Sequence, residues 1–146
     1  MAGPINTRFA VAVHLLTLLS SASAPSTSAE LAGSVGTNPV HVRRVLGRLR
    51  EAGLVRSRPG VSGGWQVAVD PAATTLERVW DAVHGEDPVL GLHEAHPDCT
   101  VGQRIQGDLA ALDREVLGAI RRRLAGTTVA DVARGDVAAD VVPASA

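Results

Sequence analysis

Six arginines lie between His41 and Arg58, and the only acidic residue in that stretch is Glu51. These arginines are Arg43, Arg44, Arg48, Arg50, Arg56 and Arg58. A guanidinium group stays charged and presents its donors in a planar fork, which suits phosphate oxygens and the O6/N7 edge of guanine. The local positive charge therefore predicts contact with a polyanion, and we expect that polyanion to be DNA.

The overall composition hides this excess of positive charge. The 146-residue chain has a formal net charge of −1, and all 14 of its basic residues are arginine. This length is enough for one domain with a real core and an additional helix. A single cysteine excludes an intramolecular disulfide framework and suits a reducing cytoplasm.

The first arginines lie on a predicted helix. Thr37 or Asn38 can cap it, and Pro39 suits its first turn, where a missing N–H costs nothing. Gly53 follows the helix at a position that favours left-handed backbone. The apolar residues at helical spacing, which we expect to be buried, are Val42, Val45, Leu46 and Leu49.

The remaining arginines lie on a predicted hairpin. A strand begins at Leu54 or Val55, and two glycine-containing pairs, 59–60 and 63–64, turn the chain. Residues that alternate along the returning strand are Trp65, Val67 and Val69. A helix followed by a glycine-tipped hairpin, with arginine on both, is typical of a winged helix.

Two helices are expected before residue 37. The first spans about 6–19, and its inner-face candidates are Phe9, Val13, Leu16 and either Leu19 or Ala12. The second spans about 28–35, with Ser26, Thr27 or Ser28 as its cap. Its expected core residues are Ala29, Leu31, Ala32 and Val35. The second and third helices together form a predicted helix-turn-helix.

The first helix has an alternative interpretation. Arg8, then FAVAVHLLTLL and SASA, is similar to a secretory signal with a cleavage site. His14 interrupts the apolar run and only one basic residue precedes it, so we favour the helix. The run is too short to span a membrane.

Two further helices are predicted after the hairpin. Thr74 and Glu77 have the spacing of a capping box, which predicts a helix over about 75–84. Its apolar stripe is Leu76, Val79, Trp80 and Val83. Residues 85–98 have no regular pattern, and a long helix is then expected over about 101–124.

The long helix carries an apolar stripe in steps of four or three. The stripe consists of Val101, Ile105, Leu109, Leu112, Val116, Ile120 and Leu124. It is too long for a small winged helix to cover, so we expect it to pack on a second copy of the chain. Asp108, Asp113 and Glu115 are expected on its solvated face. A short helical segment is expected over 128–134.

The predicted DNA contacts come from the start of the third helix and from the wing. They are Thr37, Asn38, Val40, His41, Arg43, Arg44, Arg56, Arg58, Gly60, Ser62 and Gly63. Early residues of such a helix reach base edges, whereas wing residues touch phosphate or the minor groove. Arg48 and Arg50 lie late on the helix, and solvation of an exposed face is an equal alternative for them.

The chain resembles the IscR/NsrR-type winged-helix transcription regulators over about residues 6–132. The motifs that carry the resemblance are NTRFAVAVHLL, NPVHVRRVLGRLREAGLVRSRPGVSGGW and TTLERVWDAVHG. Through HEAHPDCTVGQRIQ the chain is most similar to the YwnA-like branch. The resemblance implies a homodimer in which the long helices cross, bound to an inverted-repeat operator.

The resemblance also directs attention to the loop before the long helix. Family members with an iron–sulfur cluster use three cysteines there, whereas this loop offers only Cys99, at H-x2-H-x2-C spacing from His93 and His96. We therefore expect no metal and no cofactor. Cys99 lies just before a helix N-terminus, which can make a thiol reactive. The alternatives are a thiol sensor and a small residue packed under the loop.

These observations predict a mainly α protein with a small β-hairpin: a winged helix-turn-helix plus a long dimerisation helix. The expected parts are a DNA-binding domain (1–84), a sensor loop (85–100), a dimerisation helix with a short terminal helix (101–134) and a flexible tail (135–146). The expected function is a cytoplasmic, homodimeric transcriptional repressor that responds to an unidentified small-molecule or redox signal. The chain has no catalytic carboxylate pair, nucleophile–base motif or phosphate loop, so we expect that the protein is not an enzyme. A protein-interaction module and a secreted protein are the alternatives.

Overall fold

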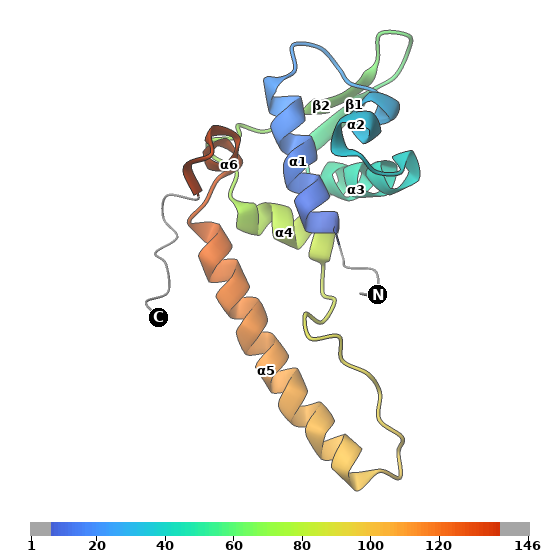
Figure 1. Cartoon of the computed structure of the whole chain (residues 1–146), viewed down its shortest axis with the longest axis vertical. Coiled ribbons are helices and arrows are strands. Elements are labelled where there is room, and N and C mark those ends of the chain that lie inside the picture. Colours follow the sequence, from blue (N-terminus) through green and yellow to red (C-terminus); the bar gives the residue numbers. More distant parts are fainter. Residues whose placement is uncertain (1–6, 138–146) are drawn as a thin grey trace.

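The computed structural model describes residues 7–137 and confirms the expected fold class. Helices α1–α4, α6 and the hairpin form one body, from which the long helix α5 extends (Figure 1). The predicted tail falls largely outside the described residues. The elements are α1 (Arg8–Ser21), α2 (Ser28–Val35), α3 (Pro39–Glu51), β1 (Val55–Arg58), β2 (Gly64–Val67), α4 (Leu76–His84), α5 (Thr100–Ala125) and α6 (Val129–Arg134).

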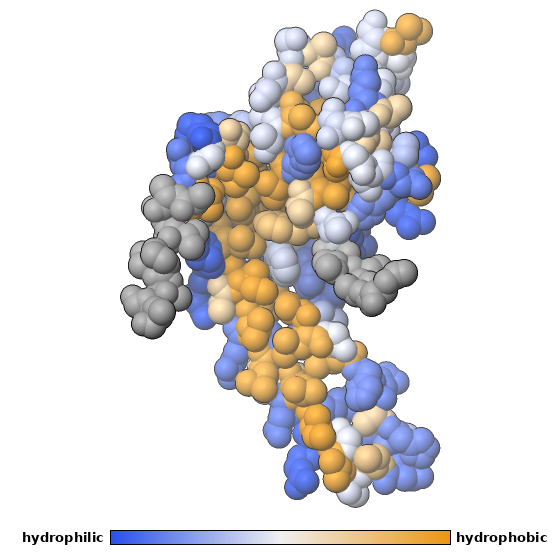
Figure 2. All heavy atoms as spheres, in the orientation of Figure 1, coloured by the Kyte–Doolittle hydropathy of each residue, from blue (hydrophilic) through white to orange (hydrophobic). Residues whose placement is uncertain are grey.

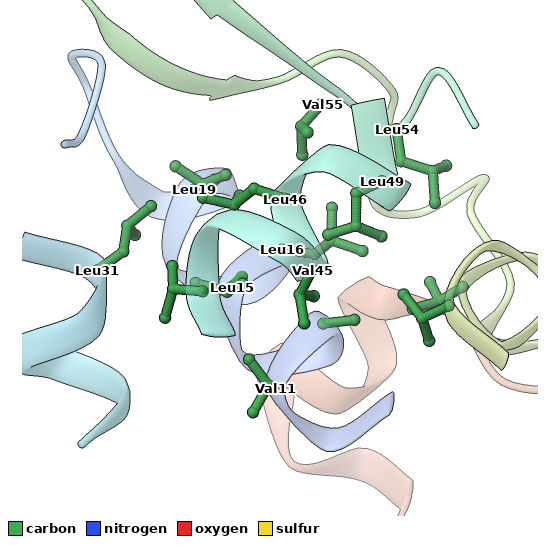
Figure 3. Packing of buried hydrophobic residues seen from close by; sticks show 14 of the residues in the cluster. Val11, Leu15, Leu16, Leu19, Leu31, Val45, Leu46, Leu49, Leu54 and Val55 are labelled. Atoms are coloured by element: carbon green, nitrogen blue, oxygen red, sulfur yellow. The ribbon is translucent and has the colours of Figure 1, made fainter. Parts of the chain in front are cut away.

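Helix α1 lies at the centre of the body and packs against α3, α4, α6 and β2. Because neighbours surround it, the helix buries more of its circumference than a single stripe. Phe9 and Val13 are half-buried and pack against the core, as expected for the inner face. The buried residues of α1 are Val11, Ala12, Leu15, Leu16 and Leu19, several of which Figure 3 shows against α3. Packing therefore accounts for the apolar run that is similar to a signal sequence.

The helix-turn-helix forms from α2 and α3 as expected. Thr27 caps α2 through a reciprocal capping box with Glu30. Asn38 caps α3, and its Oδ1 accepts a hydrogen bond from the Val40 N–H at 2.8 Å. The predicted buried stripe of α3, Val42, Val45, Leu46 and Leu49, is confirmed. Ala29 is exposed, contrary to expectation, because it lies about 200° around α2 from Leu31.

The wing is an antiparallel pair in which Val55 faces Val67 and Arg58 faces Gly64. Ser26 and Trp65 exchange two backbone hydrogen bonds of 3.0 and 2.8 Å, which tie the segment before α2 to β2. A side chain at position 64 would clash with the Ser26 backbone, so this close approach requires glycine. The wing is thus fixed to the helix-turn-helix at its base.

Helix α4 begins one residue later than the capping-box prediction implied. Its cap is Thr75, which accepts from the Arg78 N–H, so the assignment of Thr74 to a capping box was wrong. Thr74 is buried: its hydroxyl donates to the Asp70 carbonyl at 2.8 Å, and its carbonyl accepts from the Val129 N–H at 2.9 Å. Thr74 therefore connects the segment before α4 to the start of α6 and does not cap α4.

The apolar stripe of α5 divides into two halves. Val101, Ile105, Leu109 and Leu112 are 36–52% exposed, whereas Val116, Ile120 and Leu124 are half-buried. The half-buried part lies where α5 packs against α4, and there Arg121 pairs with Asp81 at 2.8 Å. Figure 2 shows an apolar band that continues along the protruding part of α5.

Asp113 was expected on the solvated face of α5, and that expectation was wrong. Its side chain is 7% exposed, and its Oδ1 accepts a hydrogen bond from the Leu90 N–H at 2.7 Å. The loop before α5 folds back along the helix and covers this carboxylate. Across the described residues, no helix is both long and apolar enough to cross a membrane.

Candidate nucleic-acid interface

Helix α3 presents two different faces. Its apolar stripe is buried in the body, whereas Arg43 and Arg44 on the other face are exposed. Near the start of the helix, Val40 and Asn38 are also exposed, and Thr37 is half-buried. His41 is half-buried, with Nε2 at 3.3 Å from the Thr7 hydroxyl. A helix anchored along one side can thus present two guanidinium groups to a groove.

Two later arginines have partners within the protein. Arg48 Nη1 donates to the Val83 carbonyl at 3.5 Å, which connects α3 to the end of α4. Arg50 lies over the Trp65 ring, with 5.5 Å between Cζ and the ring centroid, a cation–π arrangement. These contacts give both side chains a structural role, separate from the exposed pair at positions 43 and 44.

The wing exposes a second set of candidate groups. Arg56 and Arg58 are two residues apart on β1, so they share one face of the hairpin, and both are exposed. At the tip, Gly60 has a φ of 101°, and a methyl group on Gly63 would overlap the Arg58 carbonyl oxygen. Ser62 is exposed beside them. These two glycines are therefore required by the geometry of the turn.

The structure adds Arg8 to this set, a residue that was read from the sequence only as part of a signal-like start. A cleft of about 200 Å³ is lined by Arg8, His41, Arg44, Val45 and Arg48. The start of α1 thus lies beside the exposed, arginine-bearing side of α3. The sequence shows only that Arg8 lies at the start of a helix. The packing of α1 on α3 brings Arg8 next to the arginines of α3.

Arg8 is held in place by an acidic partner from the loop after α4. Its Nη2 lies 2.8 Å from Asp87 Oδ2. The hydrogen bond from Arg8, and then its charge, lower the pKa of the Asp87 carboxyl. The pair joins the start of α1 to the loop that leads to α5.

Cys99 is exposed at the start of α5, so the interpretation of Cys99 as a packed residue was wrong. It caps the helix: its Sγ accepts a hydrogen bond from the Gly102 N–H at 3.2 Å. His93 and His96 are exposed as well. Within residues 7–137, no three His, Cys, Asp or Glu side chains are grouped to hold a metal ion.

The fold and this surface define a class of protein. A helix-turn-helix with an arginine-bearing second helix, followed by a hairpin with outward arginines, is the architecture of winged-helix DNA-binding regulators. The comparisons with known proteins agree with this class. The chain belongs to the Rrf2 family, whose profile is described as "Iron-dependent Transcriptional regulator" and matches residues 5–135. It is therefore a transcriptional regulator and not an enzyme.

A curated relative supports the same assignment. The chain is 40% identical over 130 residues to YwnA of Bacillus subtilis strain 168, whose name describes an HTH-type transcriptional regulator. The match covers 88% of this chain and 96% of YwnA. The family match and this relative confirm the resemblance to the IscR/NsrR-type regulators and to their YwnA-like branch.

Solved structures share the fold. CymR of B. subtilis, described as its global cysteine regulator, has a TM-score of 0.63 and 21% identity, covering 91% of this chain and 98% of CymR. IscR of T. potens has a TM-score of 0.63 and 19% identity, covering 97% of this chain and 94% of IscR. At these identities the likeness is one of fold.

The iron in the family description does not fit the residues of this chain. Cys99 is the only cysteine, and among the described residues His93, His96 and Cys99 do not come together as a set of metal ligands. An iron–sulfur cluster held by cysteines would need more thiolates than this loop provides, and the described residues bring no three potential ligands together for a single iron ion.

Proposed function

We propose that the protein is a homodimeric repressor that reads an inverted-repeat operator through residues 38–52 and the wing, 56–64. The observation that carries this proposal is the exposure of Arg43 and Arg44 on a helix whose opposite face is fully buried. Such a helix can enter the major groove without moving its core contacts. Bidentate contacts from arginine to guanine would supply sequence discrimination.

The wing supports a second set of contacts. Arg56 and Arg58 on one face of the hairpin suit phosphate or the minor groove, as do backbone amides near Gly60, Ser62 and Gly63. Phosphate contacts add affinity and fix the register of the protein on the duplex. The proposed site is completed at the start of α3 by Thr37, Asn38, Val40 and His41.

The dimer is supported by the exposed half of the α5 stripe. Val101, Ile105, Leu109 and Leu112 form an apolar surface on a helix that protrudes from the body. Apolar surface of this kind is stabilised when it is covered, and a second α5 is the simplest complement. The half-buried Val116, Ile120 and Leu124 would extend the contact towards the body.

We assign the chain to four functional parts: DNA binding (1–84), a sensor loop (85–100), dimerisation (101–134) and a tail (135–146). Repression would follow if the bound dimer blocks access of polymerase to a promoter in the cytoplasm. Any thiol-based redox response would run through Cys99, because the chain has no other cysteine.

Selection of bound fragments from the genome of origin tests the proposal. We expect the recovered fragments to share an inverted repeat with half-sites about one helical turn apart, or a multiple of it. Binding should weaken steeply with salt through counterion release. No enrichment at low salt would contradict the proposal and would favour a winged helix that binds an acidic protein.

A further inference from the structure

A cavity of about 210 Å³ lies between the start of α1, the end of α4 and the first part of the loop to α5. Figure 1 shows α4 beside the start of α1, at the point where this loop leaves the body. Apart from Arg8, none of the candidate DNA-contacting residues lines this cavity. Its lining residues are Arg8, Phe9, Trp80, Val83, His84, Pro88 and Val89.

The wall of the cavity is aromatic and well supported. The Phe9 and Trp80 rings meet edge-to-face at 5.4 Å and 65°. His84 stacks on Trp80, with 4.3 Å between ring centroids. The His84 Nε2 lies 2.6 Å from the Asp87 carbonyl oxygen, which fixes the imidazole. An apolar ligand would therefore meet a preformed surface.

A charged group at this cavity favours a ligand with acceptor atoms. This group is Arg8, whose side chain is 24% exposed, while its partner Asp87 is 62% exposed. Asp87 can thus be displaced into water at small cost.

We propose that this cavity binds a small monocarboxylate with a single-ring or branched apolar body. The apolar body would lie against Phe9 and Trp80, and the carboxylate would replace Asp87 on the Arg8 guanidinium. An arginine can bind a carboxylate by two parallel hydrogen bonds. The size is suitable, because an engineered apolar cavity of about 150 Å³ already holds benzene.

A regulatory consequence rests on the proposed function. Arg8 lines both this cavity and the cleft shared with His41, Arg44 and Arg48 on the DNA-facing side. Arg8 is already paired with Asp87, so a bound carboxylate adds one negative charge close to α3 and releases the loop that Asp87 ties to α1. Occupancy of the cavity should therefore lower the affinity for DNA.

Titration calorimetry of the full chain, without DNA, tests the site. Benzoate is the probe, benzyl alcohol is its uncharged counterpart, and the variants are Arg8→Gln, Val89→Trp and the exposed control Arg104→Gln. We expect saturable binding of one benzoate per chain, weaker by roughly tenfold or more for benzyl alcohol and for Arg8→Gln, where the charge-assisted bonds are lost. Val89→Trp, which fills the cavity, should abolish binding, and Arg104→Gln should bind like the parent.

Isovalerate, a monocarboxylate with a branched aliphatic body, is the second probe. The proposal is overturned if neither benzoate nor isovalerate binds saturably, or if Arg8→Gln and Val89→Trp bind benzoate like the parent. Circular dichroism melting checks that each variant is folded. If Val89→Trp does not fold, Arg8→Gln decides the outcome, because it alters a partly exposed side chain.

A DNA-binding measurement separates this inference from the proposed function. Benzoate should weaken operator binding by the parent and leave Val89→Trp unaffected. A parent that binds no DNA even without benzoate would refute the proposed function and leave the calorimetric result in force. Unchanged operator affinity at saturating benzoate would refute the regulatory consequence.

Discussion

Asp113 on α5 accepts a hydrogen bond from the Leu90 N–H at 2.7 Å, although the two residues are 23 positions apart in the sequence. The bond fastens the loop before α5 to the helix that the loop leads into. Asp113 is buried, so without this backbone donor its carboxylate oxygen would lose its hydrogen bond away from water. The position of the loop is therefore specified by a buried polar contact.

Asp113→Ala should reduce the free energy of unfolding by about 1–3 kcal/mol, because the backbone N–H loses a charged acceptor. Chemical denaturation measures this change. The matched control is Asp108→Ala on the exposed surface of the same helix, which we expect to change stability by less than about 0.5 kcal/mol. Equal effects of the two substitutions would show that the Leu90 contact does not hold the loop.

The Arg8–Asp87 pair makes a prediction about pH. The pKa of Asp87 is lowered from its ordinary value of 3.8 by the hydrogen bond from Arg8 and by its charge. A lowered pKa in the folded state contributes stability above the unfolded pKa, and this contribution is lost as the pH falls through the folded pKa. Arg8→Gln should therefore return the pKa of Asp87 towards 3.8. Carboxyl-carbon NMR titration measures it, with Arg104→Gln as the control, and an unchanged Asp87 titration in Arg8→Gln would contradict the pairing.

The exposed apolar stripe of α5 predicts the oligomeric state. Ile105→Glu places a charge in the proposed interface and should convert the dimer into a monomer, because a buried unpaired carboxylate is costly. Sedimentation velocity measures the mass. Arg104→Glu, on the neighbouring exposed position, should remain dimeric. A parent protein that sediments as a monomer at all concentrations would remove the basis for the dimer.

Gly63→Ala tests the tip of the wing. The added methyl group would overlap the Arg58 carbonyl oxygen, so the turn must open. We expect a loss of about 1 kcal/mol or more in stability and weaker DNA binding, with NMR shift changes confined to the hairpin. Val61→Ala, at a fully exposed position of the same tip, is the control. A Gly63→Ala hairpin with unchanged NMR shifts would contradict the described turn.

Local patterns in the sequence were sufficient for most of the elements. The stripe of α3, its Asn38 cap and the glycine-tipped hairpin each depend on neighbouring residues, and each appears in the structure as expected. The cap of α4 was misplaced because Thr74 and Thr75 are both suitable locally. Two contacts of Thr74 decide between them: its hydroxyl donates to the Asp70 carbonyl, and its carbonyl accepts from Val129, which is distant in sequence.

The candidate site was less accessible to sequence reasoning for the same reason. Arg43 and Arg44 could be proposed from their place on one helix. Arg8 joins them only through the packing of α1 on α3, and the burial of Asp113 depends on how the loop returns. Helical periodicity places Asp113 on a polar face but cannot show that a distant backbone segment covers that face.

The affinity of Arg43→Ala and Arg44→Ala for a selected operator tests the central claim most directly. Fluorescence anisotropy at several salt concentrations would compare them with the parent and with Arg104→Ala, after melting curves confirm that all are folded. We predict that each α3 substitution weakens operator binding by about 1–3 kcal/mol, as expected for a lost base contact, while Arg104→Ala binds like the parent. Operator binding by Arg43→Ala and Arg44→Ala that equals the parent at every salt concentration would contradict the assignment of α3 as the DNA-reading helix.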